Sequence, residues 1–366
     1  MRCVRKARST PARGTVVTNV RTFRIAVVVS LALAVGQQSS AQDLTTSLLE
    51  RYLESLREQT AIPGMSAAVV QDGRVIWKKG FGFQNIERLV RAMPDTPYPV
   101  TDLSQTFAAT VLLRQCVDQG YLEVTDRVRR WVSEYPDEKI TVGDVLRHAS
   151  TSGTYEYNPS RYESLGRVFE QCANGKYPVK LTGQLLERFN MTATVPGENI
   201  DDRNLPAPDR LLYPAASLRQ YGDVLARMAT PYKIDSRGRA TPSTYVRKPL
   251  TTSAGIVSTV EDLAEFDRSL TELVDPGTLN IAWERARSSL PTGLGWFVQR
   301  YNNQRLVWHF GVAKDAYSSL ILKVPDKGLT LIILANSDGL SAPFSLEQGD
   351  VTKSLFAQVF LKLFVP

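Results

Sequence analysis

The stretch Met65-Ser-Ala-Ala-Val-Val70, followed by Gln71-Asp-Gly-Arg74 and Val75-Ile-Trp77, decides the fold of this chain. Two short apolar runs joined by an Asp-Gly turn are typical of a β-hairpin. Pro63-Gly64 separates this hairpin from leucines at helical spacing over 43–60, which predict an amphipathic helix. A single hairpin cannot form a stable sheet, so its partner strands must come from elsewhere in the chain.

Strand patterns return only near the C-terminal end. Apolar or alternating segments cover 293–300, 305–310, 317–323 and 329–335, and a helical pattern follows over 351–364. The middle is helical and loop-rich, with a buried helix over 107–119 and capping boxes at Thr141 and Ser258. We therefore expect an α+β fold: one antiparallel sheet from both chain ends, flanked by helices, with a mainly helical region inserted. The predicted parts are 42–95 and 253–366 for the sheet and 96–252 for the helical region.

The net charge of +7 is confined to the first 41 residues. Seven cations and no acid precede residue 42, so the formal charge of the remainder is zero, which excludes a basic nucleic-acid-binding surface. The uncharged run Ile25–Gly36 and the small residues Ser39-Ser-Ala41 predict a signal peptide over 1–41, with cleavage after Ala41; an uncleaved anchor is the alternative. We expect an exported protein, periplasmic or extracellular, whose mature chain over 42–366 has no membrane span.

Cysteine and histidine are scarce. After the leader only Cys116 and Cys172 remain, both in apolar helical patterns, so buried thiols are the default and a single disulfide is the alternative. His148 and His309 are the two histidines of the chain. This composition predicts neither a zinc site nor any other metal or cofactor.

Several blocks stand in the order found in the β-lactamase-related serine hydrolases, which include class C β-lactamases, D-alanyl-D-alanine peptidases and penicillin-binding-type esterases. The blocks are Ile62-Pro-Gly-Met-Ser-Ala-Ala-Val-Val-Gln-Asp-Gly73, Ile140-Thr-Val-Gly-Asp-Val-Leu-Arg-His148, Ser253-Ala-Gly-Ile-Val-Ser-Thr-Val-Glu-Asp-Leu-Ala264 and His309-Phe-Gly311. The chain resembles this family over roughly residues 45–360. The resemblance implies the β-lactamase/transpeptidase-like fold and three catalytic clusters: SxxK, YxN and a Lys/His-x-Gly strand.

The first cluster is degraded. Thr106-Phe-Ala-Ala109 normally follows the SxxK lysine, which places Gln105 at the Lys position and Asp102 at the Ser position. Glutamine cannot act as a base, and acyl transfer to Asp would give an anhydride. A slip of register to Ser104 would still lack a lysine, and the nearest relocated motif, Thr230-Pro-Tyr-Lys233, precedes no buried helix. We interpret Asp102 and Gln105 as a variant of the capping box at the old nucleophile site.

The second cluster is also altered. By the resemblance, Tyr157 matches the Tyr of YxN, whereas Pro159 replaces the Asn and offers no amide. Only nine positions separate His148 from Tyr157, so part of the cleft wall is absent or Tyr157 is a half-buried aromatic outside the pocket.

The third cluster is best preserved. His309-Phe-Gly311 ends an apolar strand, and we expect His309 to line the cleft with Gly311 beside it. The resemblance also implies that the backbone N–H groups of Asp102 and Val312 flank the old oxyanion hole. An ionised Asp102 would repel an oxyanion there.

Three functions remain open from the sequence. The first is an exported family member that is catalytically inactive and binds a peptidoglycan-like or other small molecule in the old cleft, because SxxK and YxN are lost together. The second is an active hydrolase of esterase, β-lactamase or peptidase type, rebuilt on Tyr157 and His309. The third is an interaction module that does not use the cleft. The sequence leaves the oligomeric state undefined.

Overall fold

The computed structural model describes Met1, residues 43–200, Leu205 and residues 207–366. The chain divides into two compact units, Met1–Leu48 and Leu49–Pro366. In the first unit the described residues 43–48 are helical. The predicted signal peptide over 1–41 lies, apart from Met1, outside the described residues. All that follows concerns the second unit.

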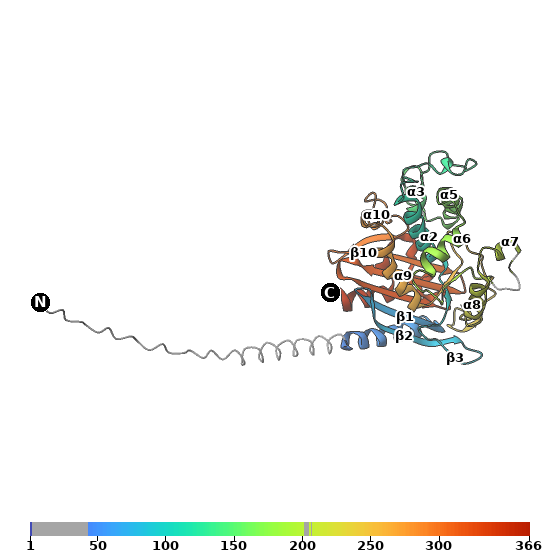
Figure 1. Ribbon diagram of the computed structural model, residues 1–366. Helices are drawn as coiled ribbons and strands as arrows, with labels where there is room; N and C mark the ends of the chain where they lie inside the picture. Colours follow the sequence, from blue (N-terminus) through green and yellow to red (C-terminus); the bar gives the residue numbers. More distant parts are fainter. Residues whose placement is uncertain (2–42, 201–204, 206) are drawn as a thin grey trace. The chain divides into compact units, whose positions relative to one another are not determined.

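Seven strands form one antiparallel sheet, and they come from both ends of the second unit (Figure 1). The order β3-β2-β1-β12-β11-β10-β9 places the N-terminal hairpin beside the four C-terminal strands, as the sequence predicts. The junction is the β1–β12 pair, in which Ala68 lies opposite Ile332. The strands are β1 (Gly64–Gln71), β2 (Arg74–Asn85), β3 (Val90–Arg91), β9 (Phe297–Tyr301), β10 (Gln304–Ala313), β11 (Tyr317–Val324) and β12 (Leu329–Ala335).

The strands β1, β10, β11 and β12 are buried on both faces. One face packs on the helical residues 49–59 and on α11 (Leu355–Phe364), through side chains such as Leu53 and Phe360. The other packs on α2 (Ser104–Leu112) and α9 (Val260–Leu273), which are joined by Phe107 stacked on Phe266 with centroids 3.9 Å apart. This double cover explains why these strands are continuous apolar runs.

The inserted segment carries most of the short helices. Figure 1 shows α2, α3, α5 and α6 gathered above the sheet. The helices of the second unit not yet named are α3 (Val142–Leu146), α4 (Pro159–Tyr162), α5 (Leu165–Cys172), α6 (Tyr177–Leu181), α7 (Ala207–Arg210), α8 (Ala215–Ala226) and α10 (Pro276–Ala282). Two small sheets, β4-β8-β5 and β6-β7, are formed by β4 (Tyr98–Pro99), β5 (Val195–Pro196), β6 (Tyr232–Ile234), β7 (Ala240–Pro242) and β8 (Ile256–Ser258).

Several predicted boundaries need correction. The capping box at Thr141 is confirmed, but α9 is capped by Thr259, whose side chain accepts the Asp262 N–H, and not by Ser258. The returning strand predicted from 293 begins at Phe297, because the glycines before it form bends. The buried helix begins earlier than predicted, at Ser104. None of the helices among the described residues is long and apolar enough to cross a bilayer.

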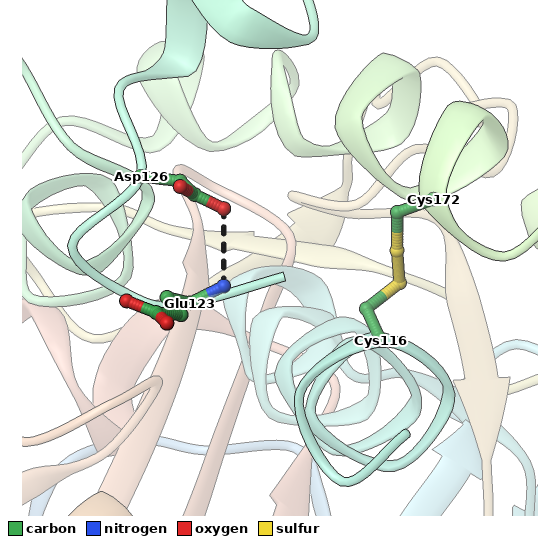
Figure 2. The surroundings of a disulfide bond; sticks show 4 residues. All are labelled: Cys116, Glu123, Asp126 and Cys172. Carbon is green, nitrogen blue, oxygen red and sulfur yellow. Dashed lines mark hydrogen bonds between the residues drawn. A yellow bond between two sulfur atoms is a disulfide. The ribbon is translucent and has the colours of Figure 1, made fainter. Parts of the chain in front are cut away.

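The two cysteines form a disulfide that ties the continuation of α2 to the end of α5 (Figure 2). Cys116 lies in a π-helical turn, Leu113–Val117, and Cys172 is the last residue of α5, with 5.9 Å between their Cα atoms. The default interpretation of two buried thiols is therefore wrong, and the single-bridge alternative holds.

Candidate functional site

A strained turn places Asp102 at the start of the buried helix. Residues Thr101–Leu103 form a 3-10 turn that runs directly into α2. Thr101 has φ +52°, a left-handed conformation that a β-branched residue rarely adopts. Backbone strain of this kind persists only where the surrounding structure holds it, and it gathers at functional sites.

The capping interpretation of Asp102 and Gln105 is wrong. Neither the turn nor α2 has a side-chain cap: their N-cap residues are Val100 and Leu103. The start of α2 lies in the core. There the Gln105 side chain contacts His148, and the Asp102 side chain contacts Val312. A capping pattern in the sequence assumes an exposed helix start, and tertiary contacts override it here.

The Asp102 carboxylate contacts Val312, one of the two predicted oxyanion-hole donors. Its Oδ2 accepts a long hydrogen bond of 3.4 Å from the Val312 N–H on β10. Burial raises the pKa of Asp102 to about 6, although the Val312 N–H, the charge of Lys248 and the Asp102 N–H each act to lower it. Both predicted oxyanion-hole donors thus act on this carboxylate, which is mostly ionised at pH 7.

Gly311 allows the turn to approach β10 this closely. A Cβ on Gly311 would collide with Thr101 Oγ1, the Val100 carbonyl oxygen and Ser319 Oγ. The absence of a side chain there is therefore what brings Asp102 within reach of Val312. The structure places Asp102, Gly311 and Val312 together, as the resemblance implies.

Gln105 contacts His148, which the sequence did not single out for the site. Gln105 Oε1 lies 2.8 Å from His148 Nε2, and His148 Nδ1 accepts the Asn158 N–H at 3.1 Å. These partners assign the proton to Nε2 and leave Nδ1 no free lone pair. Burial, followed by the neighbouring His309 and Arg161, lowers the pKa of His148 well below its usual value. His148 is therefore neutral and cannot serve as a base.

Tyr157 lies in the site with a hydroxyl that has no partner. Its ring packs 4.5 Å from His148 and 5.5 Å from Phe310, measured between centroids. Burial, and then the charge of Asp102, raise the pKa of Tyr157 well above 10. Its Oη and the facing Gln105 Nε2 are buried without a hydrogen bond of ordinary geometry, although the Gln105 side chain acts to lower the Tyr157 pKa.

Pro159 begins a short helix instead of facing the site. It stands at the first turn of α4, where its missing N–H has no consequence, and Asn158 caps that helix by accepting the Arg161 N–H at 3.1 Å. The Asn158 side-chain amide, next to the YxN position, is thus occupied by a backbone N–H of α4. The segment after Tyr157 therefore forms a helix start and offers no amide to the site.

His309 is buried on β10, on the sheet face that α2 covers. Its Nδ1 lies 2.7 Å from the Phe310 carbonyl oxygen, so this nitrogen carries the proton. Burial lowers the pKa of His309 to about 4, which makes the ring neutral at pH 7. Among the described residues Nε2 has no hydrogen-bond partner. Its predicted role in lining a cleft stays a prediction.

The segment from Tyr245 to Lys248, which the sequence analysis did not select, places the positive charge of Lys248 near enough to Asp102 to affect its pKa. The exposed Lys248 lowers the Asp102 pKa, although no cation of the described chain lies within ion-pair distance of this carboxylate. Buried Glu198 holds this segment by accepting the Tyr245 hydroxyl at 2.9 Å and the Lys248 N–H at 3.1 Å. Burial raises the pKa of Glu198 to about 7.

The two alternatives to the SxxK motif, a nucleophilic Ser104 and a motif ending at Lys233, have other partners in the structure. Ser104 is fully buried, and its Oγ accepts the Ile256 N–H at 3.3 Å. Lys233 lies on β6, exposed and paired with Asp315 at 3.3 Å, away from any helix start. Among the described residues, no group of three or more His, Cys, Asp or Glu is placed to hold a metal ion.

The fold and the site together define a protein of the β-lactamase/transpeptidase-like type. A sheet built from strands of both ends of the second unit carries His309-Phe-Gly311 on β10, and Asp102, in the turn before α2, contacts the Val312 N–H of that strand. The model of the beta-lactamase family matches residues 49–348, and the chain belongs to that family.

The relatives found are distant. Protein flp of Staphylococcus aureus strain N315 is 22% identical over 356 residues, covering 82% of this chain but 64% of the relative. The octameric penicillin-binding protein homologue from Pyrococcus abyssi superposes with TM-score 0.66 at 19% identity, covering 87% and 77% of the two chains. The D-amino acid amidase from Ochrobactrum anthropi SV3, complexed with L-phenylalanine amide, gives 0.67 at 16% identity, covering 87% and 99%. At these identities the structures establish the fold alone.

Proposed function

We propose that this chain is an exported, catalytically inactive member of the beta-lactamase family that keeps its old cleft for ligand binding. The observation that carries the proposal is the Asp102 carboxylate on the Val312 N–H. A substrate carbonyl would have to displace it, and the oxyanion formed in acyl transfer would stand beside a negative charge. The disulfide between Cys116 and Cys172 supports export, since such bonds persist in oxidising compartments.

The remaining groups of the site do not supply a base. Gln105 does not titrate, and the Tyr157 phenol is neutral far above pH 7. His148 has both ring nitrogens engaged. His309, with a pKa of about 4, is a weak proton acceptor. Loss of the nucleophile and the base together removes the covalent mechanism.

A ligand that complements the Asp102 carboxylate must offer hydrogen-bond donors. The partly buried Asp102 carboxylate accepts a long hydrogen bond from the Val312 N–H and has no cation within ion-pair distance among the described residues. An ammonium group would add a charge-assisted hydrogen bond to it. We therefore propose a small molecule with a free amine, such as an amino-acid amide of peptidoglycan type, in place of an acyl substrate.

Calorimetric titration tests the binding. D-Phenylalanine amide should bind at least about tenfold more tightly than its N-acetyl derivative. The isosteric variant Asp102→Asn should remove this preference while the protein stays folded. Equal affinity of the wild type for both compounds would contradict the amine-binding proposal, whereas steady hydrolysis of the amide would contradict the claim of inactivity.

A second function has one observation in its favour. Asp102, with a pKa of about 6, and His309, with a pKa of about 4 and an Nε2 that is unpartnered among the described residues, are two titratable groups with perturbed pKa values, and such groups cluster at active sites. A rebuilt hydrolase would use them with Tyr157. The pH dependence of small-ester hydrolysis decides: activity that is lost in His309→Ala supports the rebuilt site, and activity indifferent to it excludes this version.

A further inference from the structure

A second concave site lies at the opposite end of β10 from Asp102. This cavity of about 560 Å³ is lined by Trp283 and Arg285 after α10, by Arg300 on β9 and by Arg305 on β10. Arg305 and Val312 are separated along β10 by roughly 23 Å, at 3.3 Å per residue. The cavity is therefore distinct from the candidate site, and its function does not depend on that of Asp102.

The first indication of a ligand is the pairing of two arginines. Arg305 stands directly opposite Arg300 in the β9–β10 hairpin. Like charges directly opposite each other destabilise a strand pair. Arg305 lies 3.8 Å from Asp326, whereas neither Arg300 nor Arg285 has an ion pair among the described residues. The carboxylates that line the same cavity are Glu284 and Asp326, so its formal charge is +1.

The second indication is a pair of buried donors without acceptors. Trp283 is 6% exposed, and its indole Nε1–H has no partner among the residues that the structure describes. The Nε–H of Arg305 is likewise buried and unpartnered. A buried donor left unpaired destabilises the folded state, so such atoms require an explanation. Both donors belong to residues that line the cavity.

The neighbouring cavity provides the contrast. It shares Trp283, and at its buried end the Lys323 ammonium pairs with Asp267 and lies 3.4 Å from Thr330 Oγ1. Lys323 also lies over the Trp283 ring, 5.5 Å from its centroid. Its buried charges are thus satisfied within the protein, and among its described lining residues Trp283 alone has a buried side-chain donor without a partner.

We propose that the cavity at Trp283 binds an oxyanion group, phosphate or carboxylate, of a small ligand. Planar guanidinium groups such as those of Arg300 and Arg305 suit oxyanions. In this structure Arg300 Nη1 donates to the Asn303 carbonyl oxygen at 3.3 Å and Arg305 Nη2 lies 3.8 Å from Asp326, so a ligand would use their remaining donors. Trp283, whose buried indole N–H has no partner among the described residues, lines the same cavity. Arg285 contributes its charge, while its Nε and Nη2 donate to the carbonyl oxygens of Leu290 and Ser288.

Titration followed by ¹H–¹⁵N NMR tests this site. The chain has five tryptophans, so five indole signals are expected, and Trp283→Phe assigns the relevant one. With inorganic phosphate or citrate at low ionic strength, the Trp283 signal should shift saturably while those of Trp77 and Trp296 stay in place. Phosphate alone or citrate alone identifies which oxyanion the site prefers.

Two arginine variants distinguish binding at this specific site from nonspecific attraction of an anion to positive charge. Arg300→Gln should weaken binding by about tenfold or more. The control Arg74→Gln removes one exposed charge from the neighbouring cavity and should leave the affinity within about twofold. The proposal fails if neither probe shifts Trp283 saturably, if all indoles shift alike, or if Arg300→Gln and Arg74→Gln change the affinity equally.

Discussion

The Asp102 carboxylate accepts the backbone N–H of Val312, 210 residues away, at 3.4 Å. Asp102, which the resemblance aligns with the family nucleophile, thus occupies a backbone donor that the same resemblance assigns to the oxyanion hole. The contact joins the start of α2 to the end of β10, so it fixes the geometry of the site as well as its charge. It depends on Gly311, which leaves room for the turn.

Replacing Gly311 by Ala tests this close approach. The added methyl would collide with Thr101 and Val100, so we expect a loss of at least about 2 kcal/mol in the free energy of unfolding. Urea unfolding measures it. Gly222→Ala, whose Cβ would meet nothing within 4 Å on helix α8, is the matched control and should be neutral or stabilising. Equal effects of the two substitutions would show that the turn has space at Gly311.

Removing the hydroxyl of Tyr157 should not lower the free energy of unfolding. Its buried Oη makes no hydrogen bond of ordinary geometry among the described residues, so Tyr157→Phe should leave the free energy of unfolding unchanged or raise it by up to about 1 kcal/mol. Tyr98 is the control, because its hydroxyl lies 3.0 Å from Ser66 Oγ; Tyr98→Phe should destabilise by about 1 kcal/mol. A clear loss in Tyr157→Phe would reveal a partner for this hydroxyl.

Glu198 should make the stability depend on pH. Burial raises its pKa from 4.5 to about 7 in the folded protein, so the folded state binds the proton more tightly than the unfolded state. This contribution is complete below pH 4.5 and is lost as the pH rises through 7. Between pH 4.5 and 8, Glu198→Gln should therefore gain roughly 3 kcal/mol relative to the wild type. Chemical unfolding at both pH values measures the gain, and a difference that does not change with pH would contradict it.

The disulfide should contribute substantially to stability. Cys116 and Cys172 are 56 residues apart, and closing a loop of that length stabilises by about 4 kcal/mol in the chain-entropy account. The double variant Cys116→Ala, Cys172→Ala should lose an amount of this order in urea unfolding. The reduced wild type is the control and should behave alike. A variant as stable as the oxidised protein would show that the bond is absent in solution.

The sheet could be predicted from the sequence because its strands carry their own signal. The apolar runs around Ala68, Ile321 and Ile332 are continuous, since helices cover both faces of those strands. Local boundaries were harder to predict. Ser258 and Thr259 are both good capping residues, and only the backbone conformation selects Thr259.

The sequence predicted only those residues of the site that belong to a family motif. Asp102, Gln105 and Tyr157 come together as the resemblance implies, but the capping interpretation of Asp102 failed because Val312 and Gly311 are remote in sequence. The bond from His148 to Gln105 spans 43 residues. The scarcity of histidine in the chain was the one sequence signal that could have pointed to His148.

The absence of covalent chemistry is the central claim, and its most direct test is labelling with a fluorescent penicillin. Wild-type protein should show no covalent label on a denaturing gel. The double variant Asp102→Ser, Gln105→Lys restores a nucleophile and a base one helical turn apart and should acquire the label, because the fold around them is kept. Labelling of the wild type, lost on mutating a single residue of the site, would contradict the account.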